Sequence, residues 1–188
     1  MTKHSLHRAV AAAMILASGI FAANAGPMEL LSRRIAIPEN GYASEIAVRT
    51  SQFEVALVPP PQWRLSVDTN ATTLTWQTPD FHTMLRLRLV AGQGGGTAQG
   101  NEALRARVQA EFPEAEIRDV AECFSATHSG TSFELEERKT RFPTVTRLAF
   151  LPLDGGRLEL QLTGPLDESE SARHRLTSIM NSLRVVTR

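Results

Sequence analysis

The sequence contains one cysteine, Cys123, and it lies five residues before His128. A thiol nucleophile needs a histidine within hydrogen-bonding reach, so this is the one combination suited to thiol catalysis. A separation of five residues places the two side chains on opposite faces of a regular strand, and no neighbouring residue would lower the pKa of the thiol. We therefore interpret Cys123 as a small buried hydrophobic residue and predict no catalytic residue.

Asp80 and His82 lie two residues apart, which brings a carboxylate and an imidazole to one face of an extended segment. Zinc takes three or four ligands, and the other histidines beyond residue 25, His128 and His174, stand alone. The glycine-rich residues 92–96 lack the Lys-Ser/Thr ending of a phosphate-binding loop. The sequence predicts neither a metal site nor a bound cofactor.

Arg64, Arg86 and Arg88 occupy the polar positions of alternating strand patterns. They would form a basic strip on the outer face of a sheet, and arginine is enriched where proteins contact carboxylates or other proteins. The strip is therefore a candidate partner-binding surface, although the pattern favours the simpler interpretation that follows. The alternative is a polar face on which the arginines pair with glutamates of other strands, namely Glu134, Glu136 and Glu159.

Three aromatic residues, Trp63, Trp76 and Phe81, are candidate walls of a pocket for an apolar ligand. Large aromatic side chains at alternating strand positions more often belong to a plain core. Both interpretations stay open at this point.

Residues 1–25 have the pattern of a secretory signal peptide. Lys3 and Arg8 precede an almost wholly apolar run, residues 9–23, and a small-x-small site ends at Ala25. The apolar run is shorter than the about 20 residues that a spanning helix needs. We therefore predict cleavage after Ala25 and a periplasmic or secreted product with no transmembrane segment in the mature chain.

The predicted mature chain is close to electrically neutral. The whole chain has 20 basic and 20 acidic residues, and the signal peptide removes two of the basic ones. A net charge near −2 predicts no nucleic-acid partner. With one cysteine there is no internal disulfide, which fits a bacterial envelope and leaves stability to the hydrophobic core.

The segment that organises the chain is residues 145–185. Leucines alternate with polar residues on both sides of Asp154-Gly155-Gly156, a pattern typical of a tight hairpin. The following apolar residues are spaced by four, three and four, which predicts one stripe of an amphipathic helix; they are Ala172, Leu176, Ile179 and Leu183. This helix and the hairpin are expected to bury each other.

Earlier in the chain, residues 26–45 show no clear period and are interpreted as an N-terminal arm with at most a short strand near residues 35–37. Residues 53–89 contain four alternating segments, which indicate an antiparallel meander. A helix is expected from Asn101 to residue 112, and three strand-like segments follow it. The order predicts a single domain, residues 46–188, with an α+β fold in which helices pack on a mainly antiparallel sheet as an αβα sandwich.

Packing patterns of this domain resemble those of the PsbP/Mog1-like fold family, which includes DcrB-type periplasmic proteins. They are Phe53-x-Val55-x-Leu57 followed by Trp63, the helix ending at Phe112-Pro113, the Leu158-x-Leu160-x-Leu162 strand, and residues 179–185. The resemblance covers most of residues 46–186. It implies an αβα sandwich that binds other proteins and offers no catalytic residue to transfer.

The sequence thus favours an exported, non-enzymatic binding or assembly factor of the bacterial cell envelope, which acts through protein–protein contacts with another envelope protein. Two alternatives stay open: a small hydrolase whose site assembles from distant strands around His82 or His128, and a carrier of an apolar small ligand. The oligomeric state does not follow from the sequence.

Overall fold

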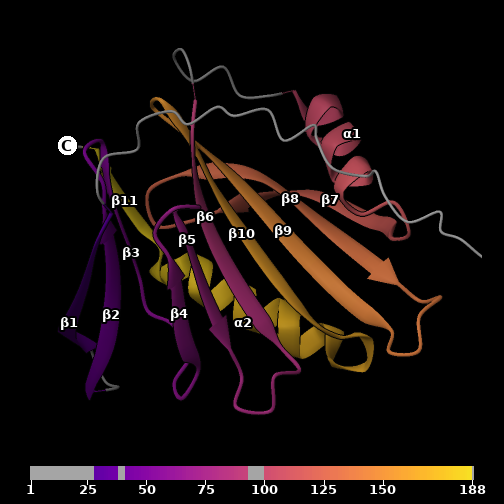
Figure 1. The fold of residues 1–188 in the computed structure, drawn as a ribbon, viewed down its shortest axis with the longest axis horizontal. Helices are drawn as coiled ribbons and strands as arrows, with labels where there is room; N and C mark the ends of the chain where they lie inside the picture. The colour runs from indigo at the N-terminus through magenta and orange to yellow at the C-terminus, as the bar shows by residue number, and fades with distance from the viewer. Residues whose placement is uncertain (1–27, 38–40, 93–99, 188) are drawn as a thin grey trace, which may run out of the picture.

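The computed structural model describes residues 28–37, 41–92 and 100–187, so the predicted signal peptide lies outside the described residues. These residues form two sheets, two α-helices and a short 3-10 helix (Figure 1). The strands are β1 (Glu29–Ile37), β2 (Gly41–Arg49), β3 (Phe53–Leu57), β4 (Arg64–Asp68), β5 (Thr73–Gln77), β6 (Met84–Ala91), β7 (Glu116–Phe124), β8 (Ser129–Glu137), β9 (Thr144–Leu153), β10 (Gly156–Pro165) and β11 (Arg184–Thr187). The helices are α1 (Asn101–Glu111), η1 (Leu166–Glu168) and α2 (Ser169–Ser182).

The larger sheet has seven antiparallel strands in the order β4-β5-β6-β10-β9-β8-β7. Its centre is the predicted hairpin of β9 and β10, and Gly155 between them has a φ of 85°, a conformation that glycine adopts without steric cost. The register pairs Leu158 with Leu151 on one side and with Leu89 of β6 on the other. The alternating leucines of β6 and β10 therefore share one face of the sheet.

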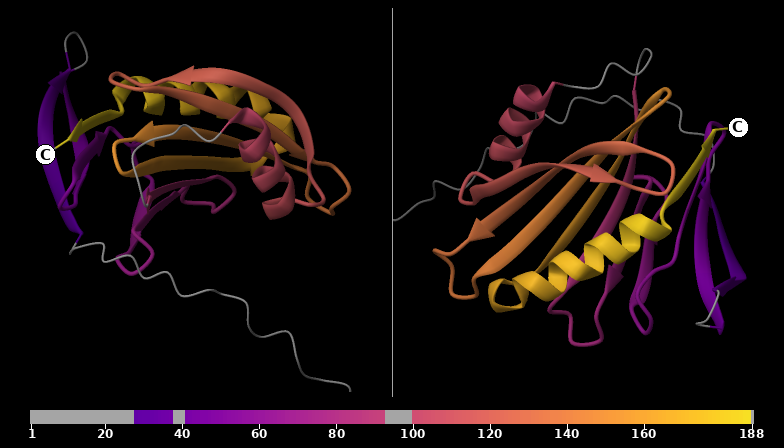
Figure 2. Two further views of the ribbon diagram at one scale, coloured as in Figure 1. Left: turned by 90° about the horizontal axis from the view of Figure 1, so that it is seen from above. Right: turned by 180° about the vertical axis from the view of Figure 1, so that it is seen from behind.

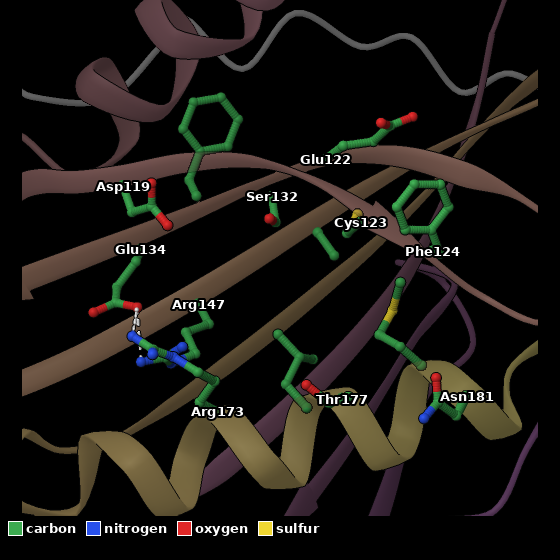
Figure 3. A pocket seen from close by; sticks show the side chains of 14 residues that line it. Asp119, Glu122, Cys123, Phe124, Ser132, Glu134, Arg147, Arg173, Thr177 and Asn181 are labelled. Carbon is green, nitrogen blue, oxygen red and sulfur yellow. Dashed lines mark hydrogen bonds and ion pairs between the residues drawn. The ribbon is translucent and has the colours of Figure 1, made fainter.

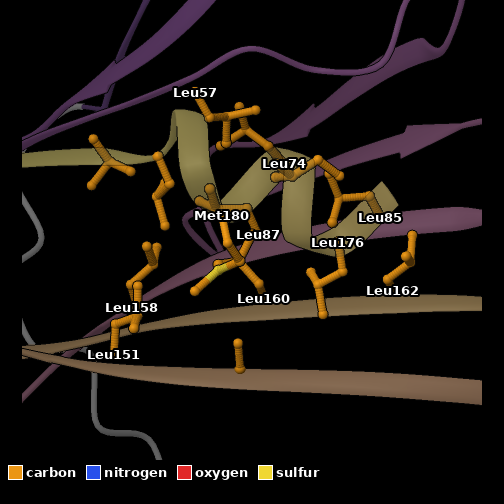
Figure 4. Close-up of a cluster of buried hydrophobic side chains, with 14 of the residues drawn as sticks. Leu57, Leu74, Leu85, Leu87, Leu151, Leu158, Leu160, Leu162, Leu176 and Met180 are labelled. Carbon is orange, nitrogen blue, oxygen red and sulfur yellow. The ribbon is translucent and has the colours of Figure 1, made fainter. Parts of the chain in front are cut away.

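That leucine-rich face is covered by α2 (Figure 4). Leu176, Ile179 and Met180 from the helix are buried against leucines of β5, β6 and β10. Each such side chain contributes roughly 1.5–3 kcal/mol when it leaves water, before the cost of ordering is subtracted. The helix and the sheet therefore stabilise each other, as the apolar stripe predicts.

The opposite face carries α1 at one end only. Leu104 and Val108 of this helix pack on Phe133, Leu148 and Phe150 of β8 and β9, and the two phenylalanine rings meet edge to face. The views from above and from behind place α1 and α2 on opposite sides of the sheet (Figure 2). The predicted α+β class, with helices on both faces of an antiparallel sheet, is confirmed.

The smaller sheet has the order β1-β2-β3-β11 and joins the first strands of the chain to the last one. Residues 26–45 were expected to form an arm, yet residues 29–49 contain the two nine-residue strands β1 and β2. Their pattern is weak because β1 is an edge strand with mostly exposed side chains. Glu45 of β2 is 2% exposed and pairs with Arg184 of β11, which ties the C-terminal strand to this sheet.

Within the described residues, no helix combines the length and the apolar character that crossing a bilayer demands.

We expect Leu160→Ala to lower the free energy of unfolding by about 2–5 kcal/mol, because it leaves a cavity under α2 where Leu160 is 1% exposed. Val186→Ala, on the exposed edge strand β11, is the matched control and should change stability by less than about 0.5 kcal/mol. Urea denaturation measures both. Equal effects would contradict the packing described for α2.

Candidate functional site

The three arginines predicted as a surface lie on the face of the large sheet that carries α1. Arg86 and Arg88 are two residues apart on β6, and the register places them opposite Gln161 and Glu159 of β10. Arg64 begins β4 two strands away, and its guanidinium lies 5.3 Å from the centre of the Phe81 ring. No described helix covers β4, β5 or β6 on this face (Figure 1).

Two further arginines join Arg88 around the carboxylate of Glu159. The Nη1 atom of Arg107, from α1, lies 2.7 Å from Oε1 of Glu159, and Arg157 donates to the same oxygen through Nε. Arg88 donates to Oε2 through Nε, at 2.8 Å, and through Nη2. We call Arg86, Arg88, Arg107, Arg157 and Glu159 the arginine cluster.

Glu159 remains ionised in this cluster although it is only 8% exposed. Burial raises the pKa of its carboxyl, but hydrogen bonds from Arg107, Arg157 and Arg88 lower it by more in total, so the pKa lies below the ordinary value. Both carboxylate oxygens already accept hydrogen bonds, Oε1 from Arg157 and Oε2 from Arg88. Glu159 therefore holds three guanidinium groups in place and has little remaining capacity for a fourth.

Pairing of Arg88 with Glu159 was one of the alternatives that the sequence indicated. The contact of Arg107 with Glu159 was not predicted. Its position between the buried residues Leu104 and Val108 was the available signal, because a residue beside them on α1 must border the sheet. The other two candidate glutamates lie elsewhere: Glu134 pairs with Arg147, and Glu136 pairs with Arg118 and Arg138.

The three aromatic candidates lie in different environments. Trp76 is 1% exposed and belongs to the main core, and Trp63 is half-buried against that core. Phe81 is 58% exposed on the β5–β6 turn, with a φ of 63°. The turn is held by Asp80 Oδ1, which accepts hydrogen bonds from the hydroxyl of Thr78 and the amide of His82.

A groove of about 360 Å³ separates α2 from the curled edge of the large sheet formed by β7, β8 and β9 (Figure 3). Leu176 and Met180 from the helix face Ala149 and the half-buried Cys123 across it. At one end the buried Arg147 donates to Ser169 Oγ at 3.0 Å and pairs with Glu134 at 2.7 Å. These contacts fix the first turn of α2 to the sheet.

Cys123 lies in the wall of the groove, and burial, with the nearby charge of Glu122, raises the pKa of its thiol to about 11. A reactive thiol requires a shift in the opposite direction. His128 lies in the β7–β8 turn, where Nδ1 is 2.8 Å from Oγ1 of Thr127. His82, on another turn, is exposed, with Nδ1 3.9 Å from Oδ2 of Asp80.

Across residues 28–37, 41–92 and 100–187, no three side chains of the metal-binding types gather in one place.

No protein-family model matches the chain, and no curated protein sequence matches it. Among solved structures it is similar to the Ran-binding protein Mog1p of Saccharomyces cerevisiae, with 12% identity, a TM-score of 0.51, and coverage of 83% of this chain and 96% of Mog1p. This likeness establishes the fold: the chain is an α+β protein of the Mog1/PsbP-like fold class.

Two other structures match at lower TM-scores. LpqN, involved in cell envelope biogenesis of Mycobacterium tuberculosis, is 13% identical, with a TM-score of 0.41 and coverage of 84% of this chain and 91% of LpqN. A Bacteroides thetaiotaomicron protein is 13% identical, with a TM-score of 0.46, over 70% of this chain. The match spans 45% of the length of the Bacteroides protein.

We expect native Cys123 to react with iodoacetamide at pH 8 about a hundredfold more slowly than a thiol with the ordinary pKa, because a pKa raised from 9.0 to about 11 lowers the thiolate fraction by that factor. The same protein unfolded in urea is the control, since the shift disappears on unfolding. A native rate equal to the unfolded rate would contradict the burial of this thiol.

We expect Glu159→Gln to lower the free energy of unfolding by about 1–3 kcal/mol at pH 7, because the hydrogen bonds from Arg88 and Arg157 and the ion pair with Arg107 are weakened. The pKa of Glu159 is depressed in the folded state, so its stabilisation is complete above the unfolded pKa of about 4.3 and is lost as the pH falls through the folded pKa. The difference in the free energy of unfolding between wild type and Glu159→Gln should therefore become smaller below about pH 4.3.

Urea denaturation at pH 7 and at pH 3 measures this change. The exposed residue Glu114, which pairs with no described residue, provides the control: Glu114→Gln should leave stability nearly unchanged at both pH values. If the free energies of unfolding of wild type and Glu159→Gln differ by the same amount at both pH values, Glu159 is not ionised in the folded state as described.

Proposed function

We propose that the protein is an exported, non-enzymatic binding or assembly factor of the bacterial cell envelope, and that it acts through protein–protein contacts. The observation that carries the proposal is the arginine cluster, which lies beside α1 on a sheet face where no described helix covers β4, β5 or β6. The buried carboxylate of Glu159 holds three guanidinium groups of this face in fixed positions.

The chemistry of the cluster suits contact with another protein. Guanidinium groups bind carboxylates in two-pronged geometry, and arginine is enriched in protein interfaces. Arginines that are already fixed lose less conformational entropy on binding than free ones, which favours affinity. Mog1p, which has the same fold, is a Ran-binding protein, so the fold supports protein binding elsewhere.

Export is the part of the proposal that rests on residues 1–25. The basic start, the short apolar run and the site ending at Ala25 have the order of a signal peptide. Protein recovered from the envelope should then begin at Gly26, which mass spectrometry of the intact chain would measure.

The test is an affinity pulldown of the chain, expressed with its own N-terminal segment and a C-terminal tag, from its native envelope fraction. We expect one protein in stoichiometric amount with wild type and its loss with the double variant Arg64→Glu/Arg86→Glu. Arg141→Glu makes one such charge reversal, on an exposed arginine of the β8–β9 turn, and should retain the partner.

A pulldown that recovers no protein with wild type, together with turnover of a tested substrate, would contradict the proposal. If the double variant still binds the partner, the contact does not depend on Arg64 or Arg86.

A further inference from the structure

We propose that the arginine cluster binds an extended acidic segment of its protein partner, with Arg86 as the first contact. This inference rests on the function proposed above and adds the chemistry of the ligand. Three observations carry it: the pairing of Arg86, the local charge, and the shape of the surface.

Arg86 is the one member of the cluster that Glu159 does not hold. Its cross-strand neighbours are the uncharged residues Thr75 and Gln161, and it forms no ion pair with another residue in the described ranges. Both oxygens of Glu159 are occupied by Arg88, Arg107 and Arg157. A carboxylate that arrives from outside would therefore find the donors of Arg86 available.

The cluster keeps a positive charge after its internal pairing. The cluster contains four guanidinium groups, three of them paired with Glu159. Glu111, at the end of α1, lines the same hollow as Arg86, Arg88 and Glu159. Counted over these described residues, two carboxylates against four arginines give a local net charge of +2. The whole chain has a formal net charge of zero, so its long-range electrostatic field is weak. The local positive charge of the cluster nevertheless favours contact with an acidic group of a partner.

The shape of the surface selects an extended chain. The hollow between Arg86, Arg88 and Phe150 has a volume of about 20 Å³, which admits one water-sized group, such as the tip of a carboxylate, and is too small to enclose a whole small molecule. Beside it, no described helix lies over β4, β5 and β6 on this face.

The spacing of the arginines defines the pattern of the segment. Arg86 and Arg88 point to the same face, two residues apart on one strand, so their Cα atoms are about 7 Å apart. Acidic side chains at alternate positions of an extended peptide have the same spacing. The expected ligand is therefore a segment with acidic residues at positions i and i+2.

The test uses a fluorescein-labelled peptide of about ten residues, in which glutamate alternates with threonine, and measures its fluorescence anisotropy with the full chain at low salt. We expect saturable binding that weakens as salt screens the charges. Arg86→Gln should weaken binding roughly tenfold, since it removes charged hydrogen bonds. Arg141→Gln is the matched control and should bind like wild type.

Circular dichroism and urea denaturation establish that Arg86→Gln is folded before its affinity is compared. Three results would overturn the inference: equal binding by wild type and Arg86→Gln, equal binding of a peptide in which lysine alternates with threonine, or tighter binding of a single-stranded oligonucleotide than of the acidic peptide.

The pulldown separates failure of this inference from failure of the proposed function. A partner that stays bound to Arg86→Gln overturns the inference and leaves the binding function standing. An empty pulldown with wild type, together with turnover of a tested substrate, contradicts the binding function itself.

Discussion

The contact between α2 and the leucines of β6 and β10 is the constraint on which the rest of the structure depends. Leu87 and Leu160 point toward the helix, and because side chains alternate along a strand, Arg86, Arg88 and Glu159 must point away from it. A slip of one residue in either strand would bring charged groups under α2, at a cost of several kcal/mol for each unpaired charge. The packing of the core therefore also determines where the arginine cluster lies.

Glu159 provides the second level of organisation. Its carboxylate is desolvated, which opposes ionisation, yet three guanidinium groups from β6, β10 and α1 stabilise the charged form. The same contacts connect α1 to the central strands across the sheet face. Arginines that are already ordered lose less conformational entropy when a partner binds. The structural role of Glu159 and the proposed binding role of its neighbours are therefore compatible.

The sequence predicts those parts of the structure that depend on local pattern. The turn at Gly155, the alternating leucines and the stripe on α2 follow from spacing alone. The hairpin of β1 and β2 was not predicted, because the side chains of β1 are mostly exposed and give no strong alternation of apolar and polar residues. Two contacts between distant segments were not predicted either: the ion pairs of Glu45 with Arg184 and of Glu159 with Arg107. Such contacts depend on which elements become neighbours in space.

The most direct test of the central claim is to observe the arginine side chains themselves during binding. NMR spectra of ¹⁵N-labelled protein resolve the Nε–Hε groups, which can be assigned with single arginine variants and followed as the envelope partner is added. The account predicts that Arg86 and Arg88 shift while Arg173, beside the groove on the opposite face, does not. Shifts confined to Arg173, with Arg86 and Arg88 unchanged, would contradict it.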